Sequence, residues 1–140
     1  MDLERDFYCQ LEILGQLPSE EGREKALKAV FAAMKSLMDA GQSKAMAAAL
    51  PEWLEPKWSD DTPAQTVNGS ADPLERVKIL GEYTYRGAAD RVLQAVLGSL
   101  VEVLDAFAKE RIGRSIPETL APYWGQANSC SMSENMGQFL

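Results

Sequence analysis

The sequence predicts an all-α fold: a six-helix bundle made of two pseudo-symmetric three-helix repeats. Three observations predict it. Apolar residues recur at helical spacing along most of the chain. The 140 residues suit one domain with one core. The chain also matches itself without a gap when it is shifted by 66 residues, which indicates an internal repeat.

The repeat places residues 11–58 on residues 77–124. AVFAAMKSLMD falls on AVLGSLVEVLD, and LPEWLEPKW falls on IPETLAPYW, so that two prolines and a tryptophan recur at one offset. A unit of this size buries too little surface to be stable alone, so the two copies are expected to share a core. We therefore predict one domain over 1–125. Its parts are repeat one at 2–58, a linker at 59–72 that is rich in turn-forming residues, and repeat two at 73–124.

The first helix is expected to run from Asp2 to Leu14, with Gly15 in the left-handed conformation that ends a helix. Its apolar stripe consists of Leu3, Phe7, Leu11 and Leu14. Pro73 and Gly81 bound the counterpart in the second repeat. Cys9 is interpreted as a small core residue and Cys130 as a free thiol, with a redox pair as the alternative.

The second helix is expected to begin after Ser19, which can cap it, and to end at Gly41. Its counterpart in the second repeat is more apolar and is predicted to be the central helix of the body. The third helix is expected to open near Ser43 and to break at Pro51, and its counterpart covers residues 108–116.

Two tryptophans, Trp58 and Trp124, occupy the same place in the two repeats and are interpreted as plugs of the shared core rather than as ligand platforms. Trp53 differs, because its counterpart is Thr119. A position that is Trp in one copy and Thr in the other is a poor core position, so Trp53 is predicted to be an exposed partner contact.

The tail at 126–140 is polar and is interpreted as flexible. It nevertheless carries apolar residues on one helical face, behind an S-x-x-E capping pattern: Met132, Met136, Phe139 and Leu140. These residues are candidates for a short docking helix that orders against a partner. The alternative is that the tail frays or folds back on the protein.

Composition excludes several classes of function. A net charge of −7 without a basic run disfavours nucleic acid and anionic membranes as partners.

No apolar stretch approaches the roughly 20 residues of a membrane helix, and the acidic start does not fit a secretory signal, so a cytoplasmic location is expected. The chain has no histidine, the commonest general base and metal ligand, and it lacks the glycine-loop, Cys-x-x-Cys and G-x-S-x-G motifs. We predict no catalytic residue, no metal and no cofactor.

The segment AAALPEWLEPKW, which follows an amphipathic helix, resembles the signature of a bacterial family catalogued as domain of unknown function 2267. That family shows a helix with an Ala-Val-Leu/Phe core, then Ala-x-x-Leu-Pro, then a short turn that ends in an aromatic residue. The matching segments are AVFAAMKSL, AAALPEWL and KW in the first copy and AVLGSLVEVL, IPETL and YW in the second. Ile116 stands where the family prefers Leu before proline, and the tail is also unlike the family. The resemblance implies a helical bacterial protein and implies no activity.

These observations favour a non-catalytic protein–protein interaction or regulatory module whose partner is another protein. One alternative is an enzyme or small-ligand-binding protein with a pocket between the two repeats, for which the polar candidates are Tyr83, Tyr85, Arg86 and Glu118. A homo-oligomer that associates through Trp53 or the tail is the third hypothesis.

Overall fold

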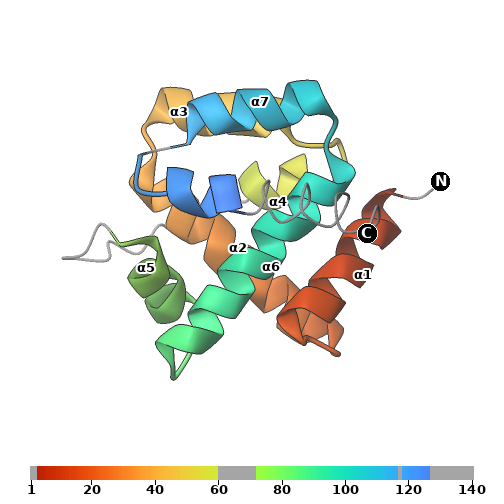
Figure 1. Cartoon of the computed structure of the whole chain (residues 1–140), viewed down its shortest axis with the longest axis vertical. Helices are drawn as coiled ribbons and strands as arrows, with labels where there is room; N and C mark the ends of the chain where they lie inside the picture. Colours follow the sequence, from red (N-terminus) through yellow and green to blue (C-terminus); the bar gives the residue numbers. More distant parts are fainter. Residues whose placement is uncertain (1–2, 60–71, 117, 127–140) are drawn as a thin grey trace, which may run out of the picture.

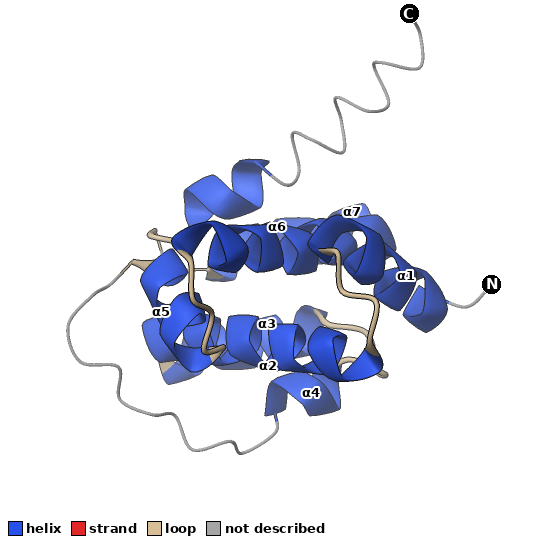
Figure 2. Cartoon of the chain, turned by 90° about the horizontal axis from the view of Figure 1, so that it is seen from below, coloured by secondary structure: helices blue, strands red, loops and turns tan. Residues whose placement is uncertain are grey.

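A computed structural model of the chain describes residues 3–59, 72–116 and 118–126, and the regular structure within these ranges is helical (Figures 1 and 2). The named helices are α1 (Leu3–Gly15), α2 (Glu20–Leu37), α3 (Ala40–Ala49), α4 (Glu55–Ser59), α5 (Pro73–Leu80), α6 (Arg86–Val103) and α7 (Ala106–Ser115). A further short helix covers 121–126. The all-α class is confirmed. The expected number of six helices is wrong for the described ranges, because a separate short helix follows the break after α3 and the break after α7.

The helices pack mainly between the two halves of the chain rather than within them. The N-terminal helix α1 packs along α6, and α5 packs along α2 as well as α6. The two long helices α2 and α6 also contact each other, and α3 lies beside α7 (Figure 1). Each half, 3–59 and 72–126, thus covers the other half's long helix.

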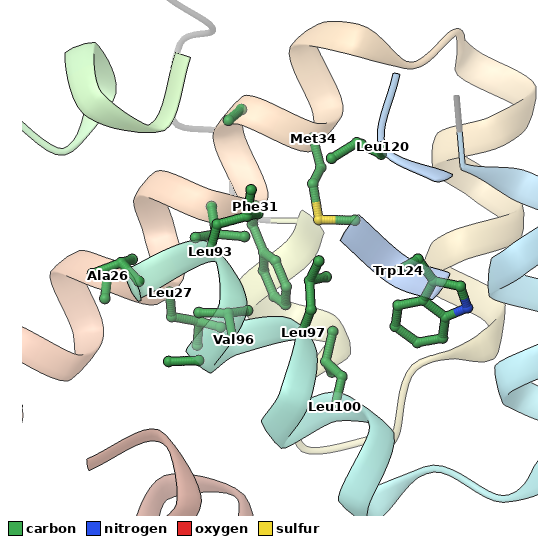
Figure 3. Packing of buried hydrophobic residues seen from close by; sticks show 14 of the residues in the cluster. Ala26, Leu27, Phe31, Met34, Leu93, Val96, Leu97, Leu100, Leu120 and Trp124 are labelled. Atoms are coloured by element: carbon green, nitrogen blue, oxygen red, sulfur yellow. The ribbon is translucent and has the colours of Figure 1, made fainter. Parts of the chain in front are cut away.

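One hydrophobic cluster holds this arrangement together and draws on both halves. Figure 3 shows Phe31 and Met34 of α2 beside Leu93 and Leu97 of α6, with the indole of Trp124 nearby. Removing such a side chain from water contributes roughly 1.5–3 kcal/mol, so the contact between the halves is the main source of stability. The counterpart of the second helix was predicted to be the central helix. The corresponding α6 buries residues on nearly every turn and contacts α1, α2 and α5.

Aspartates set the helix boundaries that the sequence reading had misplaced. We expected Gly41 to end the second helix, but α2 ends at Leu37 and Gly41 lies inside α3. The side chain of Asp39 accepts a hydrogen bond from the Gln42 amide at 2.8 Å, and the Gln42 side chain accepts one from the Asp39 amide at 2.9 Å. This capping box starts α3 at Ala40 instead of near Ser43.

An aspartate also begins α7, where the Asp105 side chain accepts a hydrogen bond from the Ala108 amide at 2.8 Å without a reciprocal bond. The helix therefore starts at Ala106, two residues before the expected position. The expected cap of α2 is confirmed, since Ser19 Oγ accepts a hydrogen bond from the Gly22 amide at 3.0 Å.

The glycines at the ends of α1 and α5 are needed for space rather than for a left-handed backbone. The left-handed residues are their successors, Gln16 with φ 54° and Glu82 with φ 56°, so the expectation for Gly15 is wrong. A Cβ at Gly15 would lie 2.8 Å from the Leu17 side chain, and one at Gly81 would lie 2.2 Å from the Tyr83 ring. In both turns the chain folds back over the glycine.

Helix α1 buries less of its apolar surface than its sequence suggests. Phe7 and Leu11 are fully buried, whereas Leu3 is 42% and Leu14 44% exposed. Cys9 is exposed, which corrects its interpretation as a core residue. It lies two residues from both Phe7 and Leu11, and a helix turns about 200° over two residues, so Cys9 faces away from the core. None of the helices described here combines the length and the apolar character that crossing a membrane requires.

Candidate functional site

A polar cavity of about 360 Å³ opens between α1, α2 and α4, on the first half of the chain. Its lining consists mostly of charged side chains: Glu4, Tyr8, Glu20, Arg23, Glu24 and Lys57. Pockets that take small ligands begin at roughly 300 Å³, so this cavity has room for a small molecule or for one side chain of a partner.

The wall formed by α2 is fixed to α1 through Arg23. One guanidinium nitrogen of Arg23 donates to Glu12 Oε1 at 2.9 Å and to the Leu17 carbonyl at 3.0 Å. The side chain therefore spans the turn between the two helices and holds the first turn of α2 beside the end of α1. Because Glu12 already neutralises it, Arg23 adds little free positive charge to the cavity.

The opposite wall is positioned by Trp58, the buried plug at the end of α4. Its indole packs edge-on against Phe31 with 5.1 Å between ring centroids. The indole nitrogen donates to the Ser43 carbonyl at 3.1 Å, and Lys35 Nζ donates to the Trp58 carbonyl at 2.6 Å. With the backbone of α4 fixed in this way, the neighbouring Lys57 reaches Glu24 across the cavity, with 2.7 Å between Nζ and Oε2.

Tyr8 faces the cavity from α1, and its ring packs edge-on against Phe7 at 5.2 Å. Burial, the nearby negative charge of Glu24 and a hydrogen bond to Glu24 raise the pKa of Tyr8 well above the usual value for tyrosine. The phenol therefore stays protonated and donates to the Glu24 carboxylate.

Two carboxylates of the lining remain without a countercharge. Within the described ranges, Glu4 and Glu20 form no ion pair, and both side chains are exposed. Since Lys57 and Arg23 are each engaged by another glutamate, the mouth of the cavity is acidic. The arrangement suits a positively charged group that approaches from solvent.

The partner-binding residues predicted from the sequence have different outcomes. Trp53 is half-buried and lies against Phe7 with 5.6 Å between ring centroids, so the expected full exposure is wrong. The turn before α4 folds its indole back over α1, where the second repeat has only Thr119. Met132, Met136, Phe139 and Leu140 lie outside the described residues. Trp58 and Trp124 are buried, which confirms their interpretation as structural plugs.

The residues proposed for a pocket between the repeats do not line this cavity. Arg86 is paired with Asp72 at 2.6 Å and Glu75 at 2.8 Å, while Tyr85 and Glu118 are exposed. The ring of Tyr83 lies under Lys25 at 5.1 Å, and its hydroxyl is buried without a hydrogen-bond partner among the described residues. Hydrophobic side chains occupy the space between α2 and α6 (Figure 3). Among the residues of known placement, no group of three or more acidic or sulfur ligands could hold a metal ion.

The described residues define a small helical protein with an acidic cavity between α1, α2 and α4. No protein-family model, no curated protein and no solved structure matches the chain. The resemblance to domain of unknown function 2267 stays a prediction based on the repeated Pro-x-x-x-x-Pro-x-Trp element.

The residues that line the cavity were not predicted from the sequence as site residues. Tyr8 sits beside a core position, and Lys57 lies inside the element that was interpreted as a plug. A signal did exist, because the counterparts of Tyr8 and Lys57 at the 66-residue offset are Leu74 and Tyr123. Positions that differ in polarity between two otherwise similar segments are the places where the halves are expected to differ in role.

Proposed function

We propose that this protein is a non-catalytic interaction module that binds a basic group of a partner protein in the cavity between α1, α2 and α4. The observation that carries the proposal is the pair of unneutralised carboxylates, Glu4 and Glu20, at the mouth of a cavity whose interior charges are already paired. An arginine or lysine side chain would place its charge between these carboxylates.

Tyr8 would complete the recognition of such a group. An aromatic face within about 6 Å of a cation attracts it, and the raised pKa keeps the ring neutral over the physiological range. The net charge of −7 also attracts a basic partner over a longer distance and raises its association rate at low salt. A cytoplasmic location belongs to the same proposal.

Trp53 and the tail would extend the contact. The half-buried Trp53 belongs to the turn that leads into α4, which supplies Lys57 to the cavity. The apolar face of Met132, Met136, Phe139 and Leu140 is proposed, as before, to dock as a short helix. Removing residues 127–140 should then weaken partner binding without changing the affinity for a free basic amino acid.

We further propose that the architecture is a duplicated unit with approximate two-fold symmetry. Adding 66 to the bounds of α2 and α3 gives the bounds of α6 and α7, and the left-handed residues Gln16 and Glu82 are related in the same way. The crossed packing of α1 on α6 and of α5 on α2 supports the same relation.

The cavity proposal can be tested by titrating the protein with N-acetyl-arginine amide and recording backbone amide shifts by NMR. Shifts are expected in α1, α2 and α4, and the neutral analogue N-acetyl-citrulline amide should produce much smaller ones. Replacing Glu4→Gln together with Glu20→Gln should lower the affinity about fivefold, since two exposed ion pairs are lost.

A matched control is Glu102→Gln together with Glu118→Gln, which removes the same net charge from exposed positions outside the cavity lining. If the control lowers the affinity as much as the cavity variant does, overall charge and not the cavity binds the cation. Equal shifts with arginine and citrulline would contradict recognition of charge.

A further inference from the structure

We infer that the surface between the two halves is also a binding site for a second copy of this chain, which associates by exchanging halves. The first half is defined as residues 3–59 and the second half as residues 72–126, and the chain joins them through residues 60–71 alone. Every contact that the first half of one chain makes with its own second half can be made equally with the second half of another chain.

The crossed packing directs the apolar faces of each half at the other half. Helix α1 packs mainly on α6, and α3 packs on α7, so the apolar faces of the first half point at the second half. At the α1–α6 crossing a Cβ placed on Gly15 would lie 3.3 Å from the Ala95 Cβ, and one placed on Gly98 would lie 3.2 Å from Leu14. This close fit is made between halves, whichever chain supplies them.

Polar contacts fix the register of the same surface. Arg76 of α5 donates to Ser36 Oγ of α2 at 2.9 Å, and Lys25 of α2 lies 5.1 Å from the ring centroid of Tyr83. An exchanged partner half would restore these contacts along with the apolar ones. The occupant of the surface is therefore specified as a matching half of the same sequence.

The balance between the two forms depends on the joining segment. Joining two parts of one chain through a short segment gives them an effective concentration of about a millimolar. Intact chains at micromolar concentration should therefore close on themselves and be monomeric. When the halves of one chain cannot pack together, the dissociation constant of the exchanged pair is the unfolding constant multiplied by the effective concentration. With an unfolding constant of about 10⁻⁴ this product is about 10⁻⁷ M.

Complementation between two damaged full-length chains tests the inference. One variant carries Leu27→Asp with Phe31→Asp and the other carries Leu93→Asp with Leu97→Asp, which are buried positions at the same places in the two halves. Each variant alone should be unfolded, because a carboxylate buried without a partner is strongly destabilising.

An equimolar mixture refolded at about 50 μM, well above the dissociation constant given by the effective-concentration argument, should recover about half of the helical circular dichroism of the native protein. Light scattering should show twice the chain mass. A mixture whose signal and mass equal the average of its separate components would overturn the proposal.

A second variant removes dependence on the damaged chains. Deleting residues 60–71 joins the end of α4 directly to α5, and these helices lie apart in both Figure 1 and Figure 2. We expect this deletion to keep the halves of one chain from packing together, so that a folded dimer forms at micromolar concentration. Inserting twelve Gly/Ser residues into the same segment is the control and should leave a monomer. A folded monomer after the deletion would contradict exchange.

Discussion

The residues that line the cavity beside α4 differ in chemistry from the residues 66 positions further along the chain, which lie in the second half. Tyr8, Arg23 and Lys57 correspond to Leu74, Ala89 and Tyr123. In the second half Leu74 and Ala89 are buried, and the pKa of Tyr123 is raised by burial and then by the charge of Asp72. Two polar residues of the cavity lining thus correspond to buried apolar residues of the second half.

This difference shows that the backbone geometry does not by itself create the site. The bounds of α2 and α3 match those of α6 and α7 at the 66-residue offset. Arg86, which lies at the offset from Glu20, nevertheless has its two carboxylate partners in its own half. Arg86 is thus neutralised by Asp72 and Glu75, whereas Glu4 and Glu20 form no ion pair within the described ranges.

The largest effect is expected when the two plugs are removed. Trp58→Ala should lower the free energy of unfolding by about 4 kcal/mol and Trp124→Ala by about 3 kcal/mol, since both substitutions leave a cavity. The Trp58→Ala substitution also removes the hydrogen bond from the indole to the Ser43 carbonyl and the ring contact with Phe31. Urea unfolding followed by circular dichroism measures both values. A smaller loss at Trp58 than at Trp124 would mean that its hydrogen bond contributes nothing to the first half.

The glycines that end α1 and α5 should differ next. Gly81→Ala should cost about 2 kcal/mol, because a new Cβ would lie 2.2 and 2.6 Å from carbons of the Tyr83 ring. Gly15→Ala should cost less than about 1 kcal/mol, since its closest neighbour is the flexible end of Leu17 and alanine has the better helix propensity. Thermal unfolding of the two variants tests the order, and equal melting temperatures would contradict it.

The helix caps are expected to differ by a smaller amount. Asp39→Ala should cost about 1.5 kcal/mol and Asp105→Ala about 1 kcal/mol, because each removes a cap and only Asp39 forms the reciprocal pair with Gln42. The matched variant Gln42→Ala should reduce the difference between the two sites. The prediction is wrong if Gln42→Ala leaves the stability of the native protein unchanged.

The smallest effect at neutral pH is expected from Tyr8→Phe, whose influence grows in alkali. Burial and Glu24 raise the pKa of Tyr8 in the folded state, so the folded protein holds this proton where the unfolded chain loses it. The contribution of Tyr8 to the free energy of unfolding is therefore complete below a pH of about 10, which is the pKa of an unfolded tyrosine. The free energy of unfolding falls as the pH rises further. Removing the hydroxyl should flatten that fall. Denaturant unfolding at pH 9 to 11 provides the measurement, and an unchanged slope would show that Tyr8 does not titrate differently in the two states.

The elements that the sequence predicted well are those set by apolar spacing. The apolar stripe over residues 27–38 and the richer stripe over residues 92–107 predicted the two long helices. Trp58 and Trp124 were identified as plugs because two copies require the same plug. Both results follow from burial, which a sequence reports directly through its periodicity.

The errors arose where local polar contacts decide the structure. The second helix was expected to run through Asp39 to Gly41, whereas the capping box of Asp39 starts the next helix. The cavity could not be inferred, because the distance from Lys57 to Glu24 depends on the direction in which α4 leaves Pro51. The face that Trp53 covers depends on the same turn. Two residues that are 33 positions apart meet only after the tertiary fold has formed.

The crossed packing of α1 on α6 has a consequence for synthesis on the ribosome. Helix α1 is synthesised first, whereas α6 is complete only at Val103. The apolar surface of α1 therefore lacks the helix that buries it until much later in translation. The ribosome adds 88 residues between Gly15, the end of α1, and Val103, the end of α6. At roughly 5–20 residues per second this takes about 4 to 18 s. During this interval the nascent chain displays the surface that chaperones recognise, and truncated products of the gene should be degraded rather than accumulate.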